Sequence, residues 1–379
     1  MKKIILFFLF SFNFLFAQIN TPEFYERQIN ILRDLDIKSD FISSLVFVQS
    51  QQDLKSKHAQ TLIDGMQNFS KITPMIRKIL AEQEVPEEIL YLAMVESGLK
   101  VNSISNAKAV GIWQFMQPTA KTLGLRIDAY VDERRDPVKS TYAAIDYLKK
   151  LKTEFGKWYL AILAYNCGNG KLRQAIKQAG SDDLNTLLDS DKKYLSLETR
   201  NFLRKILTLA FLANDKDFLL SKNASLVNYA LSNDFIKVDT PSSVSLKDIA
   251  KNLNISLATF KKYNPHFKHN FTPPGKGYYM YIPLDKVAFF DKYFEAKKLA
   301  KVDTTIPMTK IYIVKAGDSL YKIARNHHIT VDSIRELNRI HKNHLSINQK
   351  IIIPIKEKKN ANIKTAQSDS KNYSNLVRN

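Results

Sequence analysis

Between residues 71 and 215 the sequence reads as one helix after another, and no other feature constrains the fold as strongly. Pro86 and the two glutamates after it form a helix start, because proline suits the first turn and acidic side chains favour the positive end of the helix dipole. The residues that follow are apolar on nearly every side up to Gly98, which predicts a buried helix. Further helices are expected at residues 136–148, 159–165 and 202–209.

The C-terminal part of the chain contains an internal repeat. Residues 245–252 (SLKDIAKN) parallel residues 319–326 (SLYKIARN), and each copy closes with a short apolar run that contains Ile-Pro. In the second copy a strand pattern over 311–314 precedes two short helices, and a closing strand follows over 351–355. This order predicts a small βααβ unit.

The charge of the chain indicates an anionic partner. Lys and Arg outnumber Asp and Glu by 57 to 37, which gives a net charge of +20 and suggests nucleic acid, a membrane surface or an acidic polymer. The single cysteine, Cys167, excludes an intramolecular disulfide and a Cys-based zinc site. His341 and His344 have the spacing of metal ligands, but no third ligand is evident near them. We therefore expect neither a metal nor a cofactor.

The first residues resemble an export signal. Lys2 and Lys3 precede an apolar run over 4–16, which Ala17 closes. The run is shorter than the about 20 apolar residues of a membrane-spanning helix, so we expect a signal peptide over 1–17; a retained anchor is the alternative. No cysteine stands near the cleavage point, which excludes lipid attachment there. An exported protein meets little nucleic acid, and its anionic partner is then expected to be the cell wall or the envelope surface.

Glu96 stands out in the buried helix. It lies in the last turn, where desolvation and the negative end of the helix dipole both raise the pKa of a carboxyl group. A carboxyl that is neutral near the working pH is what a general acid requires. Helix position alone favours a solvent-facing glutamate at a frayed end. The motifs around Glu96 reverse that preference.

Four motifs occur in order along the helical segment. Glu-Ser at residues 96–97 is followed by Gly-Ile-Trp-Gln at 111–114, by Ala-Tyr-Asn-Cys-Gly at 164–168 and by Tyr-Leu-Ser-Leu-Glu-Thr-Arg at 194–200. Together they resemble the motifs of the goose-lysozyme-like (SLT) lytic transglycosylases. The resemblance covers roughly residues 71–215.

The resemblance implies a reaction and a set of site residues. Glu96 is implied to be the sole acid/base, which cleaves the bond between N-acetylmuramic acid and N-acetylglucosamine and leaves 1,6-anhydro ends without consuming water. Ordinary glycosidases use two carboxylates instead. Ser97, Gln114, Tyr165 and Asn166 are implied to orient Glu96 and the sugar.

Two departures from the family pattern and two other functions remain open. Phe202 stands where the family usually has tyrosine, and Ser196 replaces a proline. A hydrolytic muramidase on the same fold would need a second carboxylate, such as Asp128 or Asp132. A catalytically inactive peptidoglycan-binding protein would explain the charge and the repeat, but not the ordered motifs.

The second repeat copy resembles a LysM domain, from Tyr312 through Gly317-Asp318 to the Ile-Pro at 353–354. LysM domains bind glycans that contain N-acetylglucosamine, such as murein. The first copy lacks the Val-x-x-Gly-Asp start and looks degenerate, so glycan binding and a spacer role are both open for it.

These observations predict a mainly α protein, in which an α-helical lysozyme-like domain precedes small βααβ LysM-type units. Peptidoglycan is the expected partner and the periplasm the expected location; no nucleic acid is expected, nor a membrane span after signal cleavage. The expected segments are a signal peptide (1–17), an N-terminal helical region that packs on the next domain (18–70), the transglycosylase domain (71–220), the degenerate LysM-like region (221–300), the LysM domain (308–356) and a disordered tail (357–379).

Overall fold

The computed structural model describes residues 22–44, 60, 63–64, 66, 72–222, 235–275, 277–294, 299–304, 309–338, 340 and 344–355. The expected signal peptide and the expected disordered tail lie outside these residues. The chain divides into two compact units, Met1–Thr304 and Thr305–Asn379, which are described separately. Across the part of the chain that is described, no helix has the length and apolar character needed to cross a bilayer.

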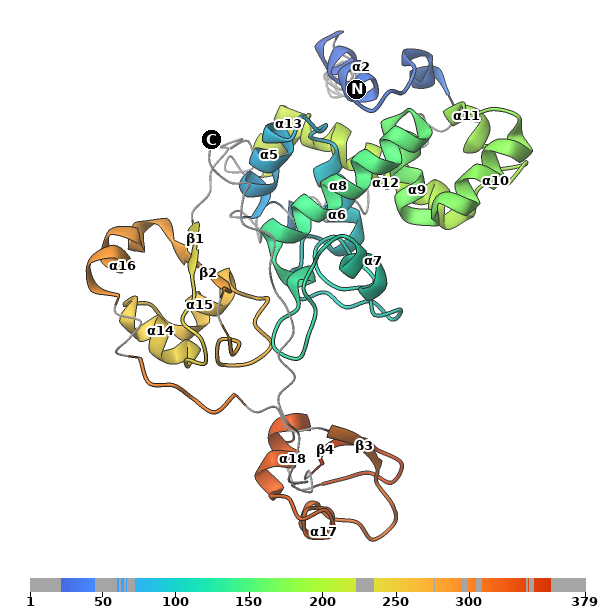
Figure 1. Ribbon diagram of the computed structural model, residues 1–379. Coiled ribbons are helices and arrows are strands. Elements are labelled where there is room, and N and C mark those ends of the chain that lie inside the picture. Colours follow the sequence, from blue (N-terminus) through green and yellow to red (C-terminus); the bar gives the residue numbers. More distant parts are fainter. Residues whose placement is uncertain are drawn as a thin grey trace, which may run out of the picture. The chain divides into compact units, whose positions relative to one another are not determined.

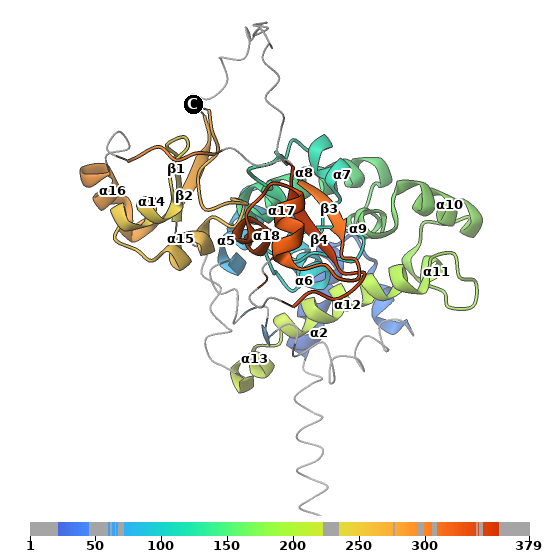
Figure 2. The same cartoon turned by 90° about the horizontal axis from the view of Figure 1, so that it is seen from below.

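Helices build the first part of the larger unit around one hydrophobic core (Figure 1). α12 packs on both α6 and α9, and α8 packs on α5 and α9. α10 and α11 extend this domain beside α9 (Figure 2). The elements are α2 (Pro22–Asp34), η2 (Ser39–Ser43), α5 (Ile72–Glu82), α6 (Ile89–Ser97), α7 (Gln117–Thr122), η3 (Glu133–Arg135), α8 (Pro137–Phe155), α9 (Trp158–Cys167), α10 (Asn169–Ala179), α11 (Leu184–Leu187), α12 (Leu197–Ala213) and α13 (Lys216–Lys222).

The structure shows the local contacts that begin and end these helices. Residues 89–94 of α6 are all buried, as its apolar sequence predicts. The helix ends because Gly98 adopts a left-handed conformation (φ 60°), which glycine reaches without steric cost. α8 begins at Pro137 because the Asp136 carboxylate accepts hydrogen bonds from the first free amides of the helix.

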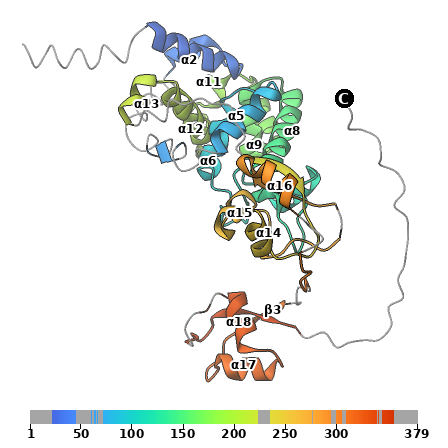
Figure 3. The same ribbon diagram turned by 90° about the vertical axis from the view of Figure 1, so that its left-hand side faces the viewer.

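The N-terminal helix α2 packs on the core of the helical domain. Ile31, Leu32 and Leu35 are buried in that core, and α2 lies beside α12 (Figure 3). The backbone continues this contact, because the Tyr159 amide donates to the Leu35 carbonyl at 3.1 Å. Helix α2 therefore adds buried apolar surface to the helical domain.

Both repeat copies fold as βααβ units with antiparallel strands. The first lies within the larger unit, and the second forms the described part of the smaller unit. In the second copy the first strand begins two residues earlier than predicted. The elements are β1 (Phe235–Asp239), α14 (Leu246–Asn252), α15 (Leu257–Tyr263), β2 (Tyr279–Pro283), η5 (Leu284–Lys286) and α16 (Val287–Tyr293), then β3 (Thr309–Ile313), α17 (Leu320–Asn326), α18 (Val331–Asn338) and β4 (Lys350–Pro354).

The fold class is thus as predicted: the residues that the structure describes are mainly helical and include two small sheets. Each repeat copy has its own small core, built around Met280 and Ile282 in the first and around Ile351 and Ile353 in the second. These are alternate residues of the closing strand, because successive side chains of a strand point to opposite faces. The other face of each sheet is left for different contacts.

Candidate active site

Glu96 occupies the last turn of α6, where the buried helix reaches the surface of the domain. Its neighbour Ser97 fixes this end of the helix, because the Ser97 hydroxyl contacts the Ile112 carbonyl at 2.8 Å and the Ala93 carbonyl at 3.3 Å. The loop at residues 111–115 is therefore tied directly to the helix end that carries Glu96.

The surroundings of Glu96 favour its protonated form. Burial of the half-buried side chain, and next the negative charge of Glu198, raise the pKa of Glu96 from 4.5 to about 7. The direction agrees with the expectation from helix position. The sequence did not predict the effect of Glu198 on the pKa of Glu96, although Glu198 lies in the motif at residues 194–200.

Glu198 is positioned by the start of α12. The Ser196 hydroxyl accepts a hydrogen bond from the Thr199 amide at 3.2 Å, which caps the helix. Serine at the family's proline position therefore supplies a capping side chain. Phe202, one turn further along, is buried in the core at 6% exposure and offers no hydroxyl to the site.

The loop at residues 111–115 has a strained and closely packed backbone. Gly111 has φ 86°, and a Cβ there would stand 1.8 Å from the Arg134 carbonyl oxygen, so no other residue fits. Gln114 also has a positive φ of 48°, and its side-chain amide donates to the Gly111 carbonyl at 2.7 Å. Strain held in this way is typical of functional loops.

Tyr165 joins helix α9 to this loop. Its hydroxyl donates to the Trp113 carbonyl at 2.6 Å, and its ring packs against Phe115 and Tyr147. Burial, followed by the charges of Glu96 and Tyr147, raises the pKa of Tyr165 well above its usual value. Tyr165 therefore stays a neutral hydroxyl beside Glu96.

Asn166 follows Tyr165 in the last turn of helix α9. It lines a cavity of about 340 Å³ between α10 and the start of α12, together with Lys171, Gln174, Tyr194 and Glu198. The cavity has the size of a small-molecule site and polar walls suited to a sugar or a peptide. The contacts thus divide the expected set: Ser97 and Tyr165 hydrogen-bond to the loop that contains Gln114, whereas Asn166 lines the cavity that also contains Glu198.

The carboxylates weighed as partners of Glu96 are engaged elsewhere. Asp132 forms a buried two-point pair with Arg134, at 2.9 and 2.8 Å. Partial burial raises the pKa of Asp128, but hydrogen bonds from the Val131 amide and from Arg126 outweigh it and lower that pKa below its usual value.

Neither a metal site nor a reactive thiol emerges from the described ranges. Among those residues, no three His, Cys, Asp or Glu side chains are placed to share a metal ion. Part of the segment around His341 falls outside them. Burial raises the pKa of the Cys167 thiol, which disfavours the nucleophilic thiolate.

Three stretches of the chain match known family models. Residues 74–188 match the transglycosylase SLT domain. Residues 234–298 match the LysM-like domain of lytic transglycosylase MltD, and residues 312–354 match the LysM domain.

Individual proteins are also similar. Membrane-bound lytic murein transglycosylase D of Escherichia coli K12 is 28% identical over 280 residues, which cover 72% of this chain and 61% of the relative. The chain thus spans less than two thirds of that relative. Peptidoglycan transglycosylase gp16 of Escherichia phage T7 is 35% identical over 121 residues, 31% of this chain and 9% of the relative. An inactive mutant of the lytic transglycosylase Slt from Pseudomonas aeruginosa is a similar solved structure, with a TM-score of 0.31, 20% identity and coverage of 42% of this chain and 25% of that one.

Proposed function

We propose that this chain, which carries a transglycosylase SLT domain followed by two LysM-type units, is a peptidoglycan lytic transglycosylase. One observation carries the proposal: Glu96 ends a buried helix of the SLT domain with its pKa raised to about 7. A carboxyl group of that pKa can donate a proton at neutral pH and accept one afterwards. Both steps are needed when one residue acts as acid and then as base.

The reaction proceeds in two proton transfers. Glu96 protonates the glycosidic oxygen between N-acetylmuramic acid and N-acetylglucosamine, and the bond from that oxygen to the muramyl C1 breaks. The 2-acetamido group of the sugar stabilises the cationic C1. The Glu96 carboxylate then removes the proton of the muramyl 6-hydroxyl, whose oxygen bonds to C1 and closes the 1,6-anhydro ring. The proton returns to Glu96, and no water is consumed.

The residues around Glu96 hold the helix end and the neighbouring loop in place. Ser97 fixes the end of α6, and Tyr165 and Gln114 fix the loop at residues 111–115. Asn166 contributes a polar amide to the neighbouring cavity, where we place part of the bound glycan. Burial, and next like-charge repulsion from Glu198, favour the protonated form of Glu96.

The nature of the product tests the proposal against hydrolysis. Transglycosylation leaves muramyl ends that are lighter by one water than hydrolytic ends. We therefore expect mass spectrometry of digested murein to show 1,6-anhydro ends. Reducing muramic ends alone would assign the protein to the muramidases, with Glu198 as the nearest candidate for a second carboxylate. Absence of any cleavage by folded protein would favour a peptidoglycan-binding protein without activity.

We place the protein in the periplasm, bound to murein through the LysM unit at residues 312–354. The expected signal at residues 1–17 supports export, and the net charge of +20 suits the carboxylates of murein stem peptides. Deletion of residues 2–17 is expected to keep the protein in the cytoplasm. Fractionation of cells that express either form measures this.

A further inference from the structure

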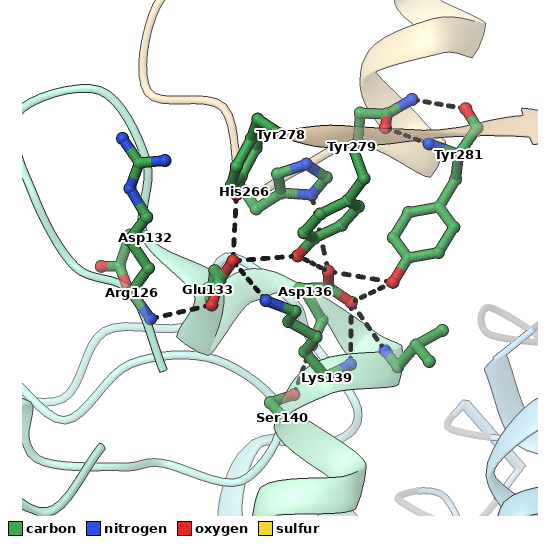
Figure 4. A network of polar contacts seen from close by, with 12 residues as sticks. Arg126, Asp132, Glu133, Asp136, Lys139, Ser140, His266, Tyr278, Tyr279 and Tyr281 are labelled. Atoms are coloured by element: carbon green, nitrogen blue, oxygen red, sulfur yellow. Dashed lines mark hydrogen bonds and ion pairs between the residues drawn. The ribbon is translucent and has the colours of Figure 1, made fainter. Parts of the chain in front are cut away.

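The first LysM-like unit (residues 235–304) is joined to the catalytic helices by a buried polar network (Figure 4). Tyr279 donates its hydroxyl proton to the Asp136 carboxylate at 2.5 Å, and Tyr281 contacts the same carboxylate at 3.1 Å. Tyr278 and Tyr279 also contact the Glu133 carboxylate, at 3.3 and 3.2 Å. Tyr279 and Tyr281 of strand β2, and Tyr278 just before it, thus contact two acidic residues from the catalytic domain.

The two carboxylates depend on these donors because they are removed from water. Asp136 is 0% exposed and Glu133 1% exposed. Lys139 forms an ion pair with Glu133 at 2.8 Å, whereas Asp136 accepts from the first amides of α8 and from the tyrosines. Burial, and then the nearby carboxylates, raise the pKa of all three phenols, which therefore remain donors. A buried carboxylate that loses a donor is strongly destabilised.

The backbone and the apolar side chains continue the same contact. The Asp132 amide donates to the His266 carbonyl at 2.9 Å, and the Lys268 amide donates to the Tyr130 carbonyl at 2.9 Å. Phe235 belongs to the main core of the catalytic helices, as do Tyr279 and Tyr281. The β2 side of the outer face of the β1–β2 sheet is therefore buried against the catalytic domain, whereas Lys237 and Asp239 of β1 are exposed.

The second repeat copy provides an internal comparison. The strand pairs have the same register, so Lys237 opposite Tyr281 in the first copy corresponds to Ile311 opposite Ile352 in the second. Ile311 is 68% exposed and Ile352 is 40% exposed, and neither carries a hydroxyl. The tyrosine face is thus a feature of the first copy, not of the βααβ fold.

The carboxylates held by the tyrosines also support the loop beside Glu96. Asp136 caps α8, whose Thr141 accepts a hydrogen bond from the Trp113 indole at 3.0 Å. Next to Glu133, Arg134 donates to the Phe115 carbonyl at 3.1 Å, and its own carbonyl packs against Gly111. The LysM-like unit is therefore connected to the loop at residues 111–115 by two chains of contacts, one through Asp136 and α8 and the other through Glu133 and Arg134.

We propose that the first LysM-like unit is a structural part of the catalytic domain rather than a glycan-binding module, and that Tyr279 and Tyr281 are positioning residues for the 111–115 loop. They act through Asp136 and helix α8. The loop in turn accepts the hydrogen bond of the Tyr165 hydroxyl, and Tyr165 lies within the electrostatic reach of Glu96. The positioning role rests on the proposed function, but the loop itself can be observed without any activity.

The test uses the full chain with Tyr279→Phe and Tyr281→Phe combined. The control is Tyr312→Phe, which removes a part-buried hydrogen bond from a tyrosine to Asp318 at 2.8 Å in the second copy. We expect faster hydrogen exchange of the 103–115 amides in the double variant and no change there in the control. On soluble murein fragments, well below the unfolding midpoint, kcat should fall at least about 10-fold. KM should stay within about twofold, and sedimentation with insoluble murein should be unchanged.

Each other outcome overturns part of the proposal. Normal exchange in the loop, or full kcat in a folded variant with a lowered midpoint, would show that the tyrosines only stabilise the fold. Weaker sedimentation of the double variant would show that the first copy binds glycan. If the double variant does not fold, Tyr281→Phe alone, which leaves the Tyr279 bond, gives the same comparison. An inactive wild type with a loosened loop in the variant would contradict the proposed function but not the positioning.

Discussion

Replacement of Glu96 by glutamine should abolish activity and, unusually for a buried substitution, stabilise the protein at alkaline pH. In the unfolded chain the carboxyl ionises at its ordinary value of 4.5, whereas the folded chain holds the proton up to about pH 7. Between these values the folded state binds more protons than the unfolded state, so the free energy of unfolding falls as pH rises. At about 1.4 kcal/mol per pH unit, the loss reaches about 3 kcal/mol above pH 8.

Glutamine keeps the shape of the side chain but carries no charge, so Glu96→Gln avoids this loss. The variant and the wild type should have equal stability near pH 4.5, and the variant should be more stable by about 3 kcal/mol at pH 8.5. Urea unfolding at both pH values measures the difference. The buried Glu88, whose pKa is raised to about 8, contributes equally to both proteins and cancels.

Activity on murein should fall by at least about 10²-fold in the same variant, because no proton can be delivered. Two results would refute the reasoning. Equal stability of the two proteins at pH 8.5 would mean that the Glu96 carboxyl is not desolvated. Normal murein cleavage by the folded variant would mean that Glu96 is not the acid.

Three further predictions concern Glu198, the loop at residues 111–115 and the second LysM unit. Glu198→Gln removes a like charge, so the pKa of Glu96 should fall and the alkaline limb of the kcat profile should move to lower pH, with 1,6-anhydro products retained; complete loss of turnover would instead make Glu198 a second catalytic carboxylate. Gly111→Ala should destabilise the protein by more than about 2 kcal/mol and disrupt the active-site loop, whereas Gly124→Ala, at φ 81° but in open space, should cost about 1 kcal/mol; equal unfolding midpoints for the two variants would contradict the close contact. A chain ended after Thr304 removes the second LysM unit and should sediment less with murein while it keeps its turnover on soluble fragments; equal sedimentation at raised salt would show that this unit is no anchor.

Local sequence determined the helices that carry the site. Helix α6 ends at Gly98 and α8 begins after Asp136, because helix capping depends on residues within one turn. The raised pKa of Glu96 follows in direction from its place at the end of an apolar helix. Ordered motifs and the internal repeat likewise stand in the sequence itself.

Only the tertiary structure decided which distant groups act on these residues. The charge of Glu198 on Glu96, the carbonyl of Arg134 against Gly111 and the tyrosines on Asp136 each join residues far apart in the chain. The sequence alone leaves two roles open for the first repeat copy, a spacer or a glycan-binding unit, because a strand pattern does not say what its outer face touches. The fold shows what this face touches, because the burial of a carboxylate depends on the segments that pack around it.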